Sequence, residues 1–344
     1  MAGKQKNAEL SKKRFPKYMM ITNNNFKKLY ATFLVLLFSI CGNIGLAQSP
    51  KVATGRLLEF RNFRSEYIGP RMVRVWLPDN YSSSKRYNVV YANDGQNLWD
   101  ASNNWTKQEW TMDETMGRLQ KQHQIKPGIV VSVDNAEKKR HSEYFPQKPF
   151  ELLPNKVQDS IMNLKWGESN LFSTKIYSDT YLKFLVEELK PFIDSSFSTY
   201  RDRKHTFIIG SSMGGLISLY ALCEYPQIFG GAICMSTHWP GIFNSTSNPI
   251  PAAFYQYLQN KLPDPTSHKI YFDYGTQTLD ADYEPFQLEV DRIMKSKGYT
   301  QKKLEIAKGK WCCTRGKFMG TKVVHPHHLY AKMKIHLALK GSLP

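Results

Sequence analysis

The residues with the clearest capacity for chemistry lie in the stretch FIIGSSMGGLIS, from Phe207 to Ser218. Within it, Gly210, Ser212 and Gly214 fit the pattern G-x-S-x-G with the serine at its centre. A serine hydroxyl is a weak nucleophile at neutral pH unless a neighbouring base accepts its proton. The pattern is short, but an apolar run precedes it and a helical pattern follows it. This setting predicts a sharp strand-to-helix turn that exposes a nucleophilic serine.

Acyl transfer by such a serine needs an oxyanion site, a base and an acid that orients the base. The backbone N–H of Met213, at the start of the expected helix, would contribute to the oxyanion site. The acid is expected after a later strand, where YFDYGTQTLD offers Asp273 inside the strand and Asp280 just beyond it. The loop position favours Asp280, with Asp282 and Asp273 as the alternatives.

Polar and aromatic residues near these segments are candidates for a substrate pocket. His238 follows its strand too early for the chain order serine, acid, histidine, so we interpret it as a pocket residue and not as the base. Trp99, Trp105, Tyr144 and Trp239 have rings that could stack on a sugar or a phenol. The alternative is that these four rings belong to the hydrophobic core.

The elements that must position these residues alternate between strands and helices. Several of the expected strands are continuous apolar runs, which is typical of a sheet covered on both faces. The strands are expected at 72–78, 87–93, 128–134, 205–210, 231–236 and 269–275. Helices are expected from Asp179 to Phe192, after a Ser178/Asp179 cap, and from Glu284 to Lys297, with Pro285 in the first turn and Gly298 after the end. This alternation predicts one α/β domain with a mostly parallel sheet. Residues 136–175 are expected to form a long excursion over the edge of the sheet.

The two ends of the chain differ from its body. Residues 1–47 combine a basic segment with an apolar run that ends in small residues, which predicts a signal peptide cleaved after Ala47 and an exported protein without a stable membrane span. The net charge of +18 is concentrated at the ends, because residues 48–307 carry 31 basic and 28 acidic residues. A nearly neutral body without a basic stripe argues against nucleic-acid binding. We therefore divide the chain into residues 1–47 and a domain at 48–344.

The motifs together resemble the putative-esterase branch of the α/β-hydrolases, which includes esterase D, feruloyl esterase and enterochelin-esterase-like enzymes. The resemblance runs from about Gly55 to about Leu304. It rests on six segments in the order of the family: VRVWLPDNY, YANDGQNLWD, IVVSVDN…R…EYFPQKP, IIGSSMGG, MSTHWPG and YFDYGTQTLDADYEPFQ. The resemblance implies an α/β-hydrolase fold and ester hydrolysis through an acyl-enzyme, without metal or cofactor. Acyl or aromatic esters of carbohydrates are the implied substrates, with a siderophore ester as the second choice.

The resemblance also assigns a role to the turn that follows the second expected strand. The second oxyanion contact would come from the backbone N–H of Gly95 or Gln96, with Asp94 shaping the turn beside the pocket. The alternative is a tight Asn-Asp-Gly turn without a chemical role.

The base should lie some thirty residues beyond the acid, but residues 309–344 do not show it. Members of the family end in a pattern like G-A-x-H-x-E-x-x-W-x-x-R-L-x-I-P, whereas this chain continues GKWCCTRGKFMGTKVVHPHH. The four histidines of this tail lack acidic neighbours, which argues against a metal site.

A slipped reading frame explains the tail. The codons from Trp311 onward, read one base later, permit GAAHEENSWEQRLYIPTIFMLK, with histidine in the place of Thr314. The glycine, the tryptophan and one basic position of this reading are forced by the genetic code. The alternative is a genuinely divergent tail, in which case the chain is an inactive hydrolase fold kept for binding a carbohydrate or a partner.

Overall fold

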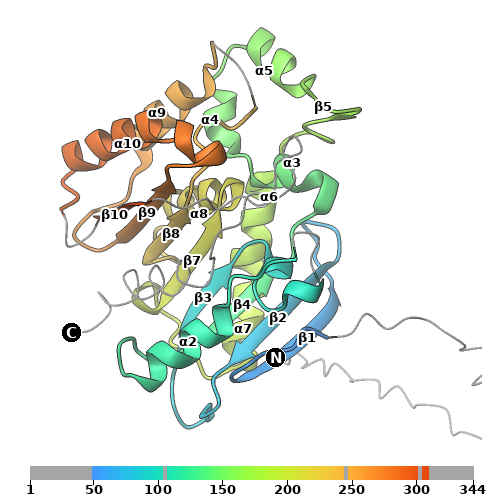
Figure 1. Ribbon diagram of the computed structural model, residues 1–344, viewed down its shortest axis with the longest axis vertical. Coiled ribbons are helices and arrows are strands. Elements are labelled where there is room, and N and C mark those ends of the chain that lie inside the picture. Colours follow the sequence, from blue (N-terminus) through green and yellow to red (C-terminus); the bar gives the residue numbers. More distant parts are fainter. Residues whose placement is uncertain (1–48, 104–106, 244–246, 301–303, 310–344) are drawn as a thin grey trace, which may run out of the picture. The chain divides into compact units, whose positions relative to one another are not determined.

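The computed structural model describes residues 49–103, 107–243, 247–300 and 304–309. Its main feature is an eight-stranded sheet with the strand order β1-β2-β4-β3-β7-β8-β9-β10 (Figure 1). The strands of this sheet are β1 (Arg56–Phe63), β2 (Arg71–Leu77), β3 (Asn88–Ala92), β4 (Gly128–Val133), β7 (Thr206–Ser211), β8 (Gly231–Met235), β9 (Lys269–Gly275) and β10 (Leu304–Gly309). β5 (Lys165–Trp166) and β6 (Ser169–Asn170) pair separately.

The sheet is antiparallel at one edge and parallel elsewhere. β2 pairs antiparallel with both β1 and β4, whereas β4, β3, β7, β8, β9 and β10 run parallel. The helices that connect or cover these strands are α2 (Met112–Lys121), α3 (Arg140–Tyr144), α4 (Gln147–Glu151), α5 (Asn155–Met162), α6 (Ser178–Lys183), α7 (Lys190–Ser196), α8 (Met213–Glu224), α9 (Ile250–Lys261) and α10 (Glu284–Ser296). This arrangement confirms the predicted α/β-hydrolase architecture.

The central strands are buried on both faces, as their apolar runs predicted. In β3, Val89 and Tyr91 belong to the core beneath α6 to α10, whereas Val90 and Ala92 pack into a second core with Met116 of α2. A fully buried aliphatic side chain contributes about 1.5–3 kcal/mol relative to an exposed one. Side chains therefore pack against both faces of the parallel strands. This packing fixes the carboxyl ends of the strands, where a site can form.

All six strands predicted from the sequence are present, with ends shifted by at most one residue. The helix expected from Glu284 is confirmed as α10, and Gly298 follows it with a φ of +85°. The helix expected from Asp179 is α6, which continues through a π-helical turn, Phe184–Leu189, into α7. Its predicted cap is wrong, because the Ser178 hydroxyl accepts the backbone N–H of Gln147 at 3.0 Å and does not cap its own helix.

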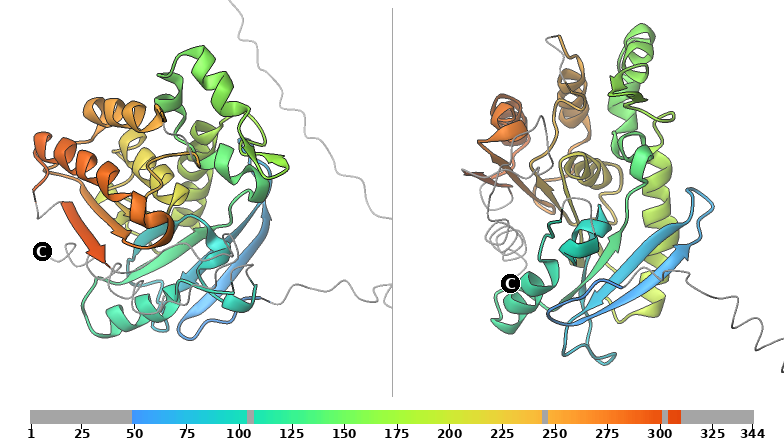
Figure 2. Two further views of the ribbon diagram at one scale, coloured as in Figure 1. Left: turned by 45° about the horizontal axis from the view of Figure 1, so that its top comes forward. Right: turned by 45° about the vertical axis from the view of Figure 1, so that its right-hand side comes forward.

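Residues 136–175 are more ordered than a plain excursion. They contain α3, α4, α5 and the β5–β6 hairpin, and their green ribbon extends away from the main sheet in Figures 1 and 2. The signal-peptide segment predicted at 1–47 and residues 310–344 fall outside the described residues. The last described element is β10, which ends at Gly309. Within the described part of the chain, no helix has the length and apolarity needed to cross a membrane.

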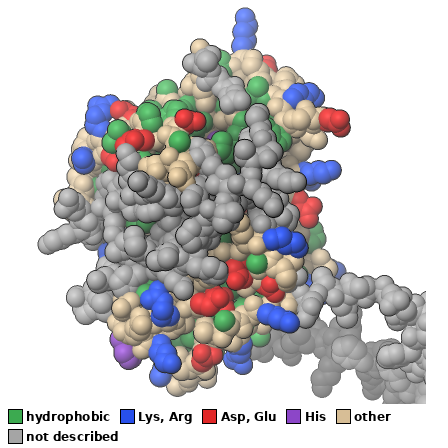
Figure 3. Space-filling view, viewed as in Figure 1, with side chains coloured by type: hydrophobic (Ala, Val, Ile, Leu, Met, Phe, Trp, Pro, Cys, Tyr) green, Lys and Arg blue, Asp and Glu red, His purple; other side chains and the backbone are tan. Residues whose placement is uncertain are grey.

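On the face of the molecule drawn in Figure 3, basic and acidic side chains alternate over short distances. This pattern agrees with the nearly balanced charge of residues 48–307. Charged side chains also pair across the antiparallel edge of the sheet, where Arg74 of β2 binds Glu59 of β1 at 3.0 Å and Asp134 at 2.6 Å.

Candidate active site

Ser212 occupies the junction between β7 and α8, as the motif predicted. Its φ and ψ angles are 59° and −119°, a conformation that a residue with a side chain rarely adopts. Such strain persists only where the surrounding structure enforces it. Here the Ser212 N–H donates to Met235 O at 2.9 Å, and the Ser212 carbonyl accepts the N–H groups of Gly215 and His238 at 3.0 and 3.3 Å. Ser212 is partly exposed.

Both glycines of the motif lie in close contacts, and the contact at Gly210 leaves no room for a side chain. A Cβ atom on Gly210 would lie 2.2 Å from the carbonyl oxygen of Gly214. A Cβ atom on Gly214 would lie 3.0 Å from Oδ2 of Asp94. The G-x-S-x-G pattern therefore reflects the space available at the turn, and the second glycine brings the elbow next to the segment that follows β3.

The turn after β3 meets the elbow because β3 and β7 are adjacent parallel strands. Asp94 has a φ of 58° and precedes the short 3-10 helix η1 (Gly95–Asn97). The first N–H groups of a helix have no acceptor within that helix. Gly95 and Gln96 begin η1, and Met213 begins α8. The carboxyl edge of the sheet thus carries two helix starts on neighbouring strands.

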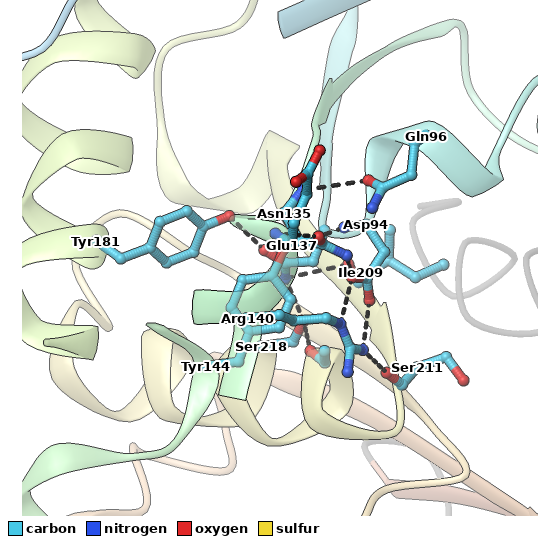
Figure 4. Close-up of polar contacts among 12 residues, drawn as sticks. Asp94, Gln96, Asn135, Glu137, Arg140, Tyr144, Tyr181, Ile209, Ser211 and Ser218 are labelled. Atoms are coloured by element: carbon cyan, nitrogen blue, oxygen red, sulfur yellow. Dashed lines mark hydrogen bonds and ion pairs between the residues drawn. The ribbon is translucent and has the colours of Figure 1, made fainter. Parts of the chain in front are cut away.

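The buried Asp94 forms an ion pair with the partly exposed Arg140, which the sequence did not reveal. Its carboxylate, 2% exposed, accepts Nε of Arg140 at 2.6 Å, Nη2 of Arg140 at 2.8 Å and the amide of Asn135 at 2.6 Å (Figure 4). Burial lowers the pKa of Arg140, but the charge of Asp94 outweighs it, and the pKa rises above its ordinary value. Gln96 adds a further tie, because its side-chain oxygen accepts the N–H of Asn135 at 3.1 Å.

Asp280 lies in a 3-10 turn (Thr278–Asp282) after β9 and is fully buried. Its Oδ2 accepts the hydroxyl of Ser236 at 2.7 Å and the N–H of Gly275 at 3.0 Å. Asp273, inside β9, is also buried, and its Oδ1 accepts the N–H of Ser236 at 3.0 Å. Asp282 is exposed. Of the three acids considered from the sequence, Asp280 is the one held in a buried loop beyond its strand.

Ser236 lies between Asp280 and the segment of Ser212, and sequence reasoning missed it. It follows Met235, whose carbonyl accepts the N–H of Ser212, and its own φ is 39°. Ser236 therefore sits at the end of β8, between the strand of Ser212 and the strand of Asp273. A serine after a strand carries no distinguishing pattern, so the order of the strands is needed to find it.

His238 is buried beside the elbow, to which its backbone N–H is bonded. Its Nδ1 forms a hydrogen bond of 2.7 Å with the hydroxyl of Tyr283. Burial, with smaller contributions from the nearby His141 and Arg140, lowers the pKa of His238 to about 3. The ring is therefore neutral at physiological pH. The position of Thr314, where the shifted frame encodes histidine, lies outside the described residues.

The aromatic rings considered for substrate stacking are mostly core residues. Trp99, Tyr144 and Trp239 are 2%, 0% and 1% exposed. The indole N–H of Trp239 donates to the Gln287 side chain at 2.8 Å, and Trp239 packs against Phe272. These surroundings match the core alternative that the sequence left open. Trp105 lies outside the described residues.

Comparison with known proteins gives a family match and two curated relatives. The family model described as Putative esterase matches residues 65–304. The uncharacterized protein YjcH of Bacillus subtilis (strain 168) is 26% identical over 185 residues, which are 54% of this chain and 62% of that protein. YbbA of the same strain is 25% identical over 163 residues, 47% of this chain and 54% of that protein. The chain thus spans less than two thirds of the length of these relatives.

Two solved structures share the fold at low identity. A ferulic acid esterase superposes with a TM-score of 0.53 at 16% identity, covering 83% of this chain and 97% of that one. An IroE-like serine hydrolase from Shewanella oneidensis gives 0.56 at 16% identity, covering 83% and 79%. The family match extends over more than half of the sequence and includes both helix starts and the elbow. The chain belongs to the putative esterase family.

Proposed function

We propose that the chain hydrolyses carboxylic esters with Ser212 as the nucleophile and Asp280 as the acid that orients the base. The observation that supports this most strongly is the strained backbone of Ser212 at a strand-to-helix elbow, beside the helix start at Gly95. The N–H of Met213, with that of Gly95 or Gln96, would stabilise the oxyanion. Asp94 would shape the second of these turns.

The reaction follows from these roles. The Ser212 Oγ attacks the carbonyl carbon of the ester while a base takes its proton, and the carbonyl oxygen gains the negative charge that the N–H groups stabilise. The proton passes to the departing alcohol as the C–O bond breaks, which leaves an acyl group on Ser212. Water then attacks the acyl-enzyme in the same way and releases the acid.

The proposal assigns no residue of the chain as written to the role of the base. The chain carries Thr314 where the shifted frame encodes histidine. We therefore define the frame-restored chain as residues 1–310 followed by GAAHEENSWEQRLYIPTIFMLK. The substitution of threonine for histidine favours a second function for the chain with its own tail, namely an inactive hydrolase fold that binds a carbohydrate or a partner.

Carbohydrate-linked acyl or aromatic esters are the proposed substrates, and siderophore esters are the second choice. The name of one structural relative, a ferulic acid esterase, supports an aromatic acyl group. The signal-peptide pattern of residues 1–47 supports export to the periplasm or the medium.

The proposal is tested by ester hydrolysis. We expect the frame-restored chain to release the alcohol from acetyl and feruloyl esters, and we expect Ser212→Ala to reduce kcat by about 10⁴-fold or more, as removal of the nucleophile does in serine hydrolases. Hydrolysis that persists in the Ser212→Ala variant would contradict the assignment. If the chain with its own tail binds xylan oligosaccharides and hydrolyses no ester, this would support the second function, an inactive hydrolase fold that binds a carbohydrate.

A further inference from the structure

The ion pair between Asp94 and Arg140 joins three segments that are distant in sequence. Asp94 follows β3, Arg140 begins α3 after β4, and Ser211 ends β7. Nε and Nη2 of Arg140 donate to the two carboxylate oxygens of Asp94, at 2.6 and 2.8 Å. Nη2 also donates to the backbone carbonyl of Ser211 at 3.4 Å (Figure 4). A single guanidinium therefore contacts both turns that carry the helix starts.

The geometry of this contact makes it directional. A guanidinium that meets a carboxylate through two parallel hydrogen bonds fixes both groups in one plane. The rest of the Asp94 surroundings reinforces that position, since Asn135 donates to the same carboxylate and the Asp94 N–H donates to the Tyr144 hydroxyl at 3.2 Å. Arg140 also lies over the ring of Tyr144, 5.2 Å from its centroid.

The contact of Arg140 with Asp94 and Ser211 lies next to the residues whose N–H groups are proposed to bind the oxyanion. Asp94 directly precedes Gly95 and Gln96, and Ser211 directly precedes Ser212 and Met213. The space between the turns is already minimal, because a Cβ atom on Gly214 would come within 3.0 Å of the Asp94 carboxylate. The Arg140 guanidinium spans the turns from one side while Gly214 permits their close approach.

We propose that Arg140 is a positioning residue for the oxyanion site. It holds the Gly95–Gln96 turn and the Ser212–Met213 turn at the separation that lets their N–H groups meet one oxygen atom. This inference rests on the proposed function for its catalytic meaning, but the fixed separation of the two turns is a property that can be measured without any reaction.

The first experiment compares Arg140→Gln with Lys190→Gln in the chain with its own tail. Lys190 is a matched control, because like Arg140 it binds one carboxylate, Asp194 at 2.7 Å, and one backbone carbonyl, Arg201 at 3.2 Å. Arg201 precedes β7, whereas Ser211 ends it, so the control pair holds the opposite end of the strand. Both variants break an ion pair and are expected to unfold at lower temperature.

Hydrogen exchange read by mass spectrometry separates the two variants. We expect Arg140→Gln to speed exchange by about 10-fold or more in peptides covering 93–98 and 211–216, where the N–H groups of Leu98 and Gly215 are normally bonded. Lys190→Gln should leave these peptides unchanged relative to the rest of the sheet. If these two peptides exchange at the same rate in Arg140→Gln as in Lys190→Gln, the inference is overturned, whether or not the chain is an enzyme.

Kinetics in the frame-restored chain provide the second test. Arg140→Gln should lower kcat by about 100-fold with KM changed less than 3-fold, because displacement of a catalytic group by about 1 Å costs this much in rate. Arg140→Lys keeps the charge but not the paired hydrogen bonds. Its kcat should lie between that of the frame-restored chain and that of Arg140→Gln. Activity in the parent chain with an unchanged kcat in Arg140→Gln would refute the positioning role alone, whereas an inactive parent chain would refute the proposed function.

Discussion

At the scale of single residues, the site depends on side chains that no motif marks. The Ser236 hydroxyl donates to Asp280, and the Ser236 N–H donates to Asp273. Arg140 stands inside a segment that matched the family pattern, but its partners Asp94 and Ser211 are 46 and 71 positions away. The sequence predicted Ser212 and Asp280 from local pattern. It could not predict these partners, because their contacts depend on which strands are neighbours.

Ser236→Ala tests the orientation of the acid. We expect kcat of the frame-restored chain to fall about 10-fold, because a hydrogen bond to a charged group contributes about 1.5–3 kcal/mol and its loss leaves Asp280 less well fixed. Ester hydrolysis at saturating substrate measures this. The control is Ser160→Ala, since Ser160 is exposed and donates only within its own helix. A kcat equal to that of the parent chain would show that Ser236 does not support the acid.

At the scale of elements, the central strands were predictable and the edges were not. β3, β4 and β8 are continuous apolar runs buried on both faces, so their pattern is strong. β1 was missed because it lies at the edge of the sheet, pairs with one strand and mixes charged with apolar residues. The cap at Ser178 was predicted wrongly because a tertiary contact to Gln147 competes for the same hydroxyl.

The junction of β7 and α8 gives a prediction at this scale. Gly210→Ala would place a methyl group 2.2 Å from the Gly214 carbonyl, so the elbow must open. We expect a loss of stability of about 2–4 kcal/mol, typical of backbone strain combined with overpacking, and a loss of activity with Ser212 still present. Urea unfolding and ester hydrolysis measure the two effects.

Gly69→Ala is the matched control for the Gly210 substitution. Gly69 lies in the segment between β1 and β2, and a Cβ atom there would have nothing within 4 Å. We expect its stability to stay within about 0.5 kcal/mol of the parent chain, as for most surface changes. Equal unfolding midpoints for the Gly210 and Gly69 variants would contradict the steric account of the elbow.

At the scale of the whole molecule, the site is assembled from the carboxyl ends of β3, β7, β8 and β9, which are neighbours in the sheet although their sequence positions span residues 88 to 275. The fold class followed from strand–helix alternation and from the resemblance. The base could not be located in the same way, because residues 310–344 as encoded do not follow the family pattern. Whether the site has a base therefore depends on the sequence of the C-terminal tail, and not on the sheet that positions Ser212 and Asp280.

Comparing the frame-restored chain with the chain with its own tail tests whether the base is missing. We expect the frame-restored chain to hydrolyse aryl esters at least about 10³-fold faster than the chain with its own tail, because loss of one member of a catalytic triad costs several orders of magnitude in rate. Thr314→His in the original tail is a useful comparison, since it supplies the imidazole without the rest of the shifted sequence. Equal rates for the frame-restored and original chains would contradict the reading-frame hypothesis.

The central claim is that Ser212 is the nucleophile, and covalent labelling tests it most directly. The frame-restored chain is treated with a serine-directed fluorophosphonate, digested and analysed by mass spectrometry. The account predicts one labelled peptide, with the added mass on Ser212, and no labelling of Ser212→Ala under the same conditions. A label on another residue, or undiminished labelling of Ser212→Ala, would contradict the account.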